Sequence, residues 1–146
     1  MQLSTKSRYG VRAILELALA YGKKPLQVRV IAKQQAISSK YLEQLMAMLK
    51  SAGLLKSVRG SKGGYLLARP PTEITLYHVL EALEGPVCVI ECLRQQEVCS
   101  RAGDCLTRPF WSEINTAIVD TLESTTLQDL LDRSGERQHQ ATNYQI

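Results

Sequence analysis

The chain has 146 residues, of which 45% are hydrophobic, so it can bury the core of one domain or of one domain with an extension. No stretch approaches the ~20 apolar residues of a membrane span, and Glu16 interrupts the first apolar segment, which argues against a signal peptide. These features exclude a helical membrane protein, and we expect a cytoplasmic protein with no membrane partner.

The net charge of +4 conceals a division between the two halves of the chain. Residues 1–70 hold 13 Lys and Arg against 2 Asp and Glu, a net charge of +11. Residues 71–146 hold 5 basic against 12 acidic side chains, a net charge of −7. A basic half joined to an acidic half indicates a module that binds a polyanion and a second part that stays off it. An uneven but purely solvated surface is the alternative.

Two amphipathic helices are predicted to open the chain. Apolar residues recur at three- and four-residue steps over residues 6–21, a helix that Thr5 can cap. A shorter helix is expected over residues 29–35, with Val30 and Ile31 facing inward.

A third helix and a hairpin are predicted next. Ser38 or Ser39 can cap a helix that ends near residue 52 and carries a stripe of apolar side chains. Two strand-like runs, LLKSV and YLLA, then flank the glycine-rich basic turn RGSKGG, which predicts a β-hairpin. Helix, helix, tight turn, helix and basic hairpin is the order of a winged helix-turn-helix, so the expected fold is mainly α with a small β-hairpin.

The second half of the chain is predicted to be helical around a cysteine-bearing loop. Thr75 can cap a helix that Gly85 and Pro86 end, and residues 87–106 carry all four cysteines without helical or strand periodicity. Thr107 and Pro109 can open a long helix. Thr126 and Asp129 resemble a capping box for a short last helix, followed by a polar, frayed tail from Ser134.

The third helix and the hairpin turn are the expected DNA-binding elements. The second helix of a helix-turn-helix presents its N-terminal residues to the major groove, and here these residues are Ser38, Ser39, Lys40, Tyr41, Glu43 and Gln44. Gln44 can form a pair of hydrogen bonds with adenine. Glu43 can accept a hydrogen bond from cytosine, or it can form an ion pair with basic neighbours on the helix instead. The predicted wing is Arg59, Gly60, Ser61 and Lys62, in which Arg59 suits a narrow minor groove. The alternative is a hairpin whose glycines only permit the turn.

Three cysteines lie in a segment too polar to bury them. Cys92, Cys99 and Cys105 have the spacing C-x6-C-x5-C, whereas Cys88 has apolar neighbours that suit a core role. Soft thiolates select zinc, copper(I) or iron–sulfur clusters. Cys92, Cys99 and Cys105 show neither the closely paired C-x2–4-C spacing of structural zinc sites nor the bacterial ferredoxin spacing. The spacing favours a cluster, with zinc or free redox thiols as the alternatives.

Several segments together resemble one family of regulators. STKSRYGVRAILELA, SSKYLEQL, RGSKGGYLLAR, EITLYHVLEALEGP and TLQDLL are similar to iron–sulfur cluster regulators of the IscR type, whose relatives include NsrR, RirA and CymR. The resemblance covers roughly residues 1–132. It implies a homodimeric winged-helix transcription factor with a long C-terminal dimerisation helix. It also implies that Cys92, Cys99 and Cys105 bind a cluster, with two-iron two-sulfur favoured and four-iron possible. The dimer face would be Trp111, Ile114, Ile118, Thr121 and Leu122.

The sequence departs from this family at the expected cluster ligands. Cys92 and Cys99 are separated by six residues rather than five, and Arg108 stands where IscR has a histidine ligand. Arginine is permanently protonated and will not ligate iron as histidine does. Arg8 likewise replaces a carboxylate ligand of some NsrR-like members. The fourth ligand is left open, and the candidates are Cys88, Asp104, Glu97, a small thiol and water.

The expected function is a DNA-binding regulator that senses cluster status, controls cluster-assembly genes and binds a pseudo-palindromic operator. The expected parts are a DNA-binding domain (1–86), a cluster loop (87–106), a dimerisation helix with a short last helix (107–133) and a flexible tail (134–146). The alternative is a cluster-free repressor controlled by thiol oxidation or a partner protein. A small thiol oxidoreductase is disfavoured, because the chain has no C-x-x-C and only His78 and His139 as histidines.

Overall fold

The computed structural model describes residues 3–143, and helices dominate it. Its elements are α1 (Thr5–Leu19), α2 (Val28–Gln35), α3 (Ser39–Ser51), β1 (Leu55–Val58), β2 (Gly64–Leu67), η1 (Pro71–Glu73), α4 (Leu76–Glu84), α5 (Glu91–Arg94), η2 (Gln96–Val98), α6 (Arg108–Ser124) and α7 (Leu127–Asn143). This arrangement confirms the expected mainly α fold with a small hairpin. Within the described range, no helix is long and apolar enough to cross a bilayer.

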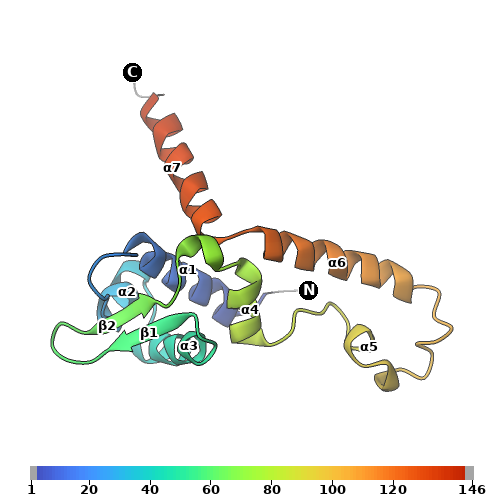
Figure 1. The fold of residues 1–146 in the computed structure, drawn as a ribbon. Helices are drawn as coiled ribbons and strands as arrows, with labels where there is room; N and C mark the ends of the chain where they lie inside the picture. The colour runs from blue at the N-terminus through green and yellow to red at the C-terminus, as the bar shows by residue number, and fades with distance from the viewer. Residues whose placement is uncertain (1–2, 144–146) are drawn as a thin grey trace.

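A core of aliphatic side chains joins the helices of the N-terminal body. α1 packs on α4 and on α3, and α2 packs on both α1 and α3 (Figure 1). The side chains of Leu42, Leu45 and Leu49 on α3 are at most 1% exposed, because their spacing places them on one face of the helix. The opposite face of α3 is therefore left to solvent.

Two details of the first helices differ from the sequence prediction. Ser4, and not Thr5, precedes α1, and its hydroxyl donates to the Glu84 carboxylate instead of capping the helix. Ile31 is fully buried as expected, but Val30 is 39% exposed. The buried face of α2 is formed by Ile31 and Ala32. Consecutive residues of an α-helix point about 100° apart, so Val30 lies about 200° around the helix from Ala32 and is turned away from the core.

The hairpin is held against the segment that precedes α2. β1 and β2 pair antiparallel, with Leu55 opposite Leu67. The backbones of Leu26 and Tyr65 exchange two hydrogen bonds of 3.1 and 2.8 Å, and the Gln27 amide donates to the Ser61 carbonyl at 3.1 Å. The wing is thereby fixed at the side of the helical body.

The C-terminal helices join the body at one short junction. The backbone N–H of Leu76 donates to Thr125, and that of Leu127 donates to Ile74, both at 2.9 Å. The side chains of Ile74 and Leu127 are fully buried at this junction. From here α6 extends away beside the loop that leads to it, and none of its residues is buried (Figure 1).

The last helix is longer than predicted. The expected capping box is present, since Thr126 N–H donates to the Asp129 carboxylate at 2.8 Å and Asp129 N–H to the Thr126 hydroxyl at 3.1 Å. The prediction of a short helix and frayed tail is wrong for residues 134–143, because α7 continues to Asn143 and projects from the body (Figure 1). Good helix formers in this polar stretch offset Gly135. Residues 144–146 of the expected tail lie outside the described range.

We predict that Gly64→Ala will loosen the wing. A Cβ at Gly64 would clash with the Leu26 carbonyl oxygen, which is backbone and cannot rotate away. The substitution should lower the free energy of unfolding by about 1–3 kcal/mol in urea titrations. Gly60→Ala is the matched control, since Gly60 also has a positive φ (109°) but open space around it. Equal losses in the two variants would contradict the clash.

Candidate nucleic-acid interface and cysteine loop

The N-terminal turns of α3 present the residues predicted to read DNA. Ser38 precedes the helix and its hydroxyl accepts from the Tyr41 N–H at 3.1 Å, so this serine serves as the N-cap. The other predicted residues, except the half-buried Tyr41, are exposed on the face opposite the buried leucines: Ser39, Lys40, Glu43 and Gln44. The placement allows the predicted contacts, whose individual roles stay predictions.

Two arginines of α1 flank an aromatic pair beside the start of α3. The rings of Tyr9 and Tyr41 meet edge to face, with centroids 6.1 Å apart. The guanidinium carbons of Arg8 and Arg12 lie 6.0 and 5.5 Å from the Tyr9 ring centroid. Arg12 is also bound to the Gln35 carbonyl on α2. These cations were not among the predicted DNA contacts, although their spacing of four residues around an aromatic places them on one helix face.

The wing presents its basic residues at the tip of the hairpin. Arg59, Gly60, Ser61 and Lys62 are all exposed. Lys62 also lines an open groove of about 300 Å³ together with Lys24, which precedes α2. Lys24 was not among the predicted DNA contacts. The only feature of the sequence that could have indicated a role for Lys24 in DNA binding is its position in the basic half of the chain.

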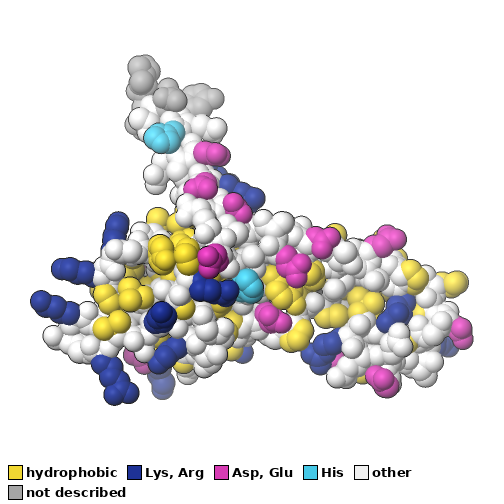
Figure 2. Space-filling view, in the orientation of Figure 1, with side chains coloured by type: hydrophobic (Ala, Val, Ile, Leu, Met, Phe, Trp, Pro, Cys, Tyr) yellow, Lys and Arg dark blue, Asp and Glu magenta, His cyan; other side chains and the backbone are white. Residues whose placement is uncertain are grey.

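The charge division of the sequence is also a division in space. Lys and Arg side chains project from the end of the molecule formed by α2, α3 and the wing, whereas Asp and Glu lie along α6 and the base of α7 (Figure 2). The acidic side chains of these two helices include Glu113, Asp120, Glu123, Asp129 and Asp132. A polyanion is therefore attracted to the end that carries α3 and the wing.

The four thiols lie in a loosely packed loop. Cys88, Cys92, Cys99 and Cys105 are free and half-buried, and neither α5 nor η2 contains a buried residue. Among residues 3–143, no three His, Cys, Asp or Glu side chains are close enough together to hold a metal ion. Cys88 donates to the Ile90 carbonyl at 3.0 Å. The thiols would have to converge through a movement of this loop, which the lack of buried packing permits.

Two side chains of α6 hold the start of the loop. The Asn115 carbonyl oxygen accepts from the Val89 N–H at 2.9 Å. The Arg108 Nη2 donates to the Cys92 carbonyl oxygen over a long 3.4 Å, and the Arg108 Nε is buried without an acceptor. Soft thiol ligands next to an unpaired cationic donor are chemically suited to bind an anionic iron–sulfur cluster. In the structure the thiols are too far apart to enclose one.

The local surroundings of Cys105 favour its thiolate. Hydrogen bonding from the Thr107 side chain lowers the pKa of Cys105, and the backbone N–H groups of Thr107 and Arg108 act in the same direction. The Thr107 hydroxyl lies 3.3 Å from the Cys105 sulfur. The start of α6 therefore provides donors for a negatively charged sulfur.

The residues predicted to form a dimer contact lie on α6, where Ile114, Ile118 and Leu122 are half-buried and Trp111 and Thr121 are exposed. Ile114, Ile118, Thr121 and Leu122 line an open, mostly apolar groove of about 410 Å³. Trp111 is 38% exposed, and its ring lies against that of Phe110. The apolar side of α6 is thus available to a second subunit, and the dimer contact stays a prediction.

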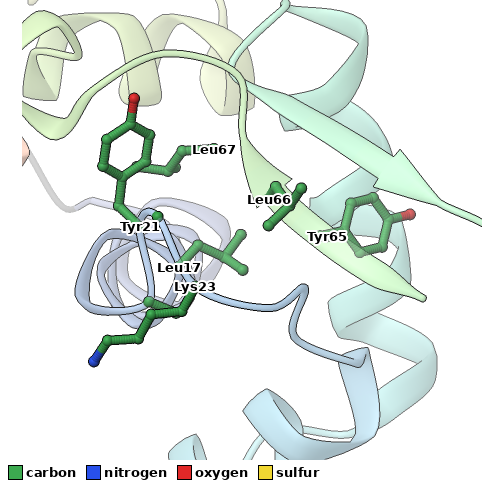
Figure 3. Close-up of a pocket in the computed structure, with 8 residues that line it drawn as sticks. Leu17, Tyr21, Lys23, Tyr65, Leu66 and Leu67 are labelled. Carbon is green, nitrogen blue, oxygen red and sulfur yellow. The ribbon is translucent and has the colours of Figure 1, made fainter. Parts of the chain in front are cut away.

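A pocket of about 260 Å³ between the end of α1 and β2 lacks the features of a ligand site (Figure 3). The polar groups of Tyr21, Lys23 and Tyr65 point away from one another and not into a shared space (Figure 3). A specific small-molecule site needs polar groups that converge. We therefore assign no ligand to this pocket, and the DNA-binding surface and the cysteine loop remain the two candidate sites.

Comparisons with known proteins connect the two sites to one family. The sequence profile of the Rrf2 family, described as an iron-dependent transcriptional regulator, matches residues 3–133. The regulator CymR of Bacillus subtilis is 41% identical over 89% of each chain, and its solved structure, titled as that of the global cysteine regulator, has a TM-score of 0.77.

IscR proteins are similar to the chain to nearly the same degree. The regulator IscR of Pectobacterium carotovorum is 38% identical over 90% of this chain and 79% of its own. The solved structure of T. potens IscR is also 38% identical, with a TM-score of 0.77 over 94% of this chain and 91% of that one. The resemblance and the winged-helix fold expected from the sequence are confirmed by these relatives.

We predict that Thr107→Val will slow alkylation of Cys105 in the metal-free protein. The variant lacks the hydroxyl that contributes most to lowering the Cys105 pKa, so less thiolate should be present near neutral pH. The iodoacetamide rate at Cys105, followed by peptide mass spectrometry between pH 6 and 9, should shift to higher pH. Thr107→Ser keeps the hydroxyl and should react like the wild type. An unchanged profile in the valine variant would refute the contribution of Thr107.

Proposed function

The chain belongs to the Rrf2 family of DNA-binding transcription regulators, and we propose that it acts in the cytoplasm as a homodimer that reports iron–sulfur cluster status. Its family consists of regulators and not of enzymes, as expected from the sequence. In this proposal the two subunits bind a pseudo-palindromic operator on double-stranded DNA, and Cys92, Cys99 and Cys105 hold the cluster. The proposed targets are cluster-assembly genes.

The proposed DNA contacts use two separate surfaces of each subunit. The exposed N-terminal turns of α3 enter a major groove, and Arg59 at the wing tip enters the neighbouring minor groove. Burial of the opposite face of α3 fixes the orientation of its polar residues, and the hydrogen bonds between the wing and residues 26–27 fix the wing. A second subunit related by two-fold symmetry would present the same pair of surfaces to the other half-site.

One observation carries the cluster part of the proposal. The loop that holds three thiols is bound directly to α6, the helix whose apolar side lines an open groove. A bound cluster would supply a redox-active and oxidant-sensitive group whose loss releases the loop. Asn115 and Arg108 would carry that change into α6, and the junction at residues 74–76 and 125–127 would carry it to α4. α4 in turn packs on α1 and α3.

A second candidate is a cluster-free repressor controlled by thiol oxidation or by a partner protein. The lowered pKa of Cys105 favours it, since the thiolate is the form that oxidants attack. The similarity to CymR supports it as well, because a solved structure of Staphylococcus aureus CymR is titled as an oxidised form. The DNA-binding surfaces are the same in both candidates.

We predict that Arg59→Ala will weaken operator binding by about 1–3 kcal/mol. It should also reduce the number of counterions released on binding, read from the salt dependence of the affinity, by about one. The exposed guanidinium at the wing tip would otherwise neutralise phosphate or lie in a narrow minor groove. Fluorescence anisotropy with operator DNA at several salt concentrations measures both quantities. Arg137→Ala on α7 is the control, since this exposed arginine lies on the other side of the junction. Equal affinities of the two variants would remove Arg59 from the interface.

We predict that alanine at Cys92, Cys99 or Cys105 will abolish the visible absorbance of anaerobically purified protein. Each substitution removes one soft ligand from a set of three. Ultraviolet-visible spectra with iron and sulfide assays per chain test the loss, and Cys88→Ala tests whether that thiol is the fourth ligand. A wild-type protein that stays colourless after reconstitution would reject the cluster and favour the second candidate. Circular dichroism shows whether the alanine variants are folded, because their DNA binding is itself expected to respond to loss of the cluster.

A further inference from the structure

Arg108 is a cation held inside the cysteine loop without an anion. It begins α6, and its Nη2 reaches back to the Cys92 carbonyl oxygen at 3.4 Å. In the part of the chain that the structure describes, the one ion pair joins Arg94 to Glu91, so Arg108 has no carboxylate partner. A half-buried guanidinium without a counter-charge is costly, and the protein would gain by supplying one.

The donor that Arg108 leaves unused is the Nε–H. This atom is buried and has no acceptor among the described residues. Buried polar groups are nearly always hydrogen-bonded, and an unpaired one costs about 1–3 kcal/mol. Cys105 lies at the same helix start, three residues before Arg108, and Cys92 lies at the far end of the Nη2 contact. Two of the three proposed ligands are thus neighbours of this one side chain.

We propose that Arg108 is a positioning and charge-balancing residue for an anionic, thiolate-bound cluster. One arm of the guanidinium holds the backbone at Cys92, and the Nε–H donates to a sulfur of the bound group. This inference rests on the proposed function and names the role of a residue that is itself no ligand. Arginine suits it, because the side chain is always charged and presents several donors in a fixed plane.

The role has a consequence that a purely structural arginine would not have. Hydrogen bonds to the sulfurs and nearby positive charge favour the reduced, more negative state of a cluster, so they raise its reduction potential. Removing Arg108 should therefore lower the potential. It should also speed cluster loss, because the backbone at Cys92 is no longer tied to α6.

The test compares reconstituted wild-type protein with Arg108→Gln, Arg108→Lys and the control Arg101→Gln. Arg101 is an exposed arginine of the same loop. Iron and sulfide per chain, the midpoint potential from a dye-coupled visible titration and the rate of cluster loss under air are measured for each. We expect a more negative potential and several-fold faster loss for the glutamine variant. The lysine variant, which keeps the charge but not the planar fork, should lie between it and the wild type.

The outcomes separate this inference from the proposed function. A wild-type protein that takes up no iron and sulfide refutes the proposed cluster, and the role of Arg108 with it. A wild-type protein with full cluster, combined with Arg108→Gln that matches Arg101→Gln in potential and in loss rate, overturns the role of Arg108 alone. If Arg108→Gln takes up no cluster, the test rests on Arg108→Lys. A potential and a rate of cluster loss equal to those of the wild type in Arg108→Lys would also overturn the proposed role of Arg108.

Discussion

A pair of backbone hydrogen bonds joins the N-terminal body of this chain to its C-terminal helices. Leu76 donates to Thr125 and Leu127 donates to Ile74, with the fully buried Ile74 and Leu127 side chains excluding water around them. Buried backbone hydrogen bonds are costly to break, because their groups would lose partners without gaining water. The start of α4 and the end of α6 therefore move together. α4 contacts both α1 and α3, so the junction connects α6 to the helix that carries the DNA-facing surface.

The separation of charge follows the same junction. The elements before it carry the basic surface, and those after it carry most of the acidic side chains (Figure 2). A polyanion is attracted to one end and repelled from the other, which orients the subunit before any base is contacted. Within the basic end, positions are set by backbone contacts: the exchange of hydrogen bonds between Leu26 and Tyr65 leaves little freedom for the wing. Electrostatic attraction and rigid placement thus act on the same surface.

The features predicted correctly from the sequence are those that local patterns determine. The stripe of leucines on α3, the turn RGSKGG and the Thr126 capping box each depend on residues a few positions apart. The features missed have two different causes. Val30 was assigned inward because an eight-residue pattern is too short to show which neighbour of Ile31 shares the buried face, and that depends on packing against other segments. The end of α7 was placed too early because the polar composition after Ser134 was weighed above the helix propensity of its residues. The spacing of the cysteines identified a candidate loop but gave no relative positions for its sulfurs.

Arg108 illustrates why the cysteine loop is the place where sequence reasoning was weakest. In the sequence it is only a residue that cannot replace a histidine ligand, whereas the structure shows it bound to the loop with one donor left over. A ligand shifts a conformational equilibrium only by the difference between its affinities for the two states. A loop without buried residues offers few contacts that can make this difference. A hydrogen bond from the Arg108 Nε–H that forms only when an anionic group is bound would supply this difference in affinity. It would act directly at the first turn of α6.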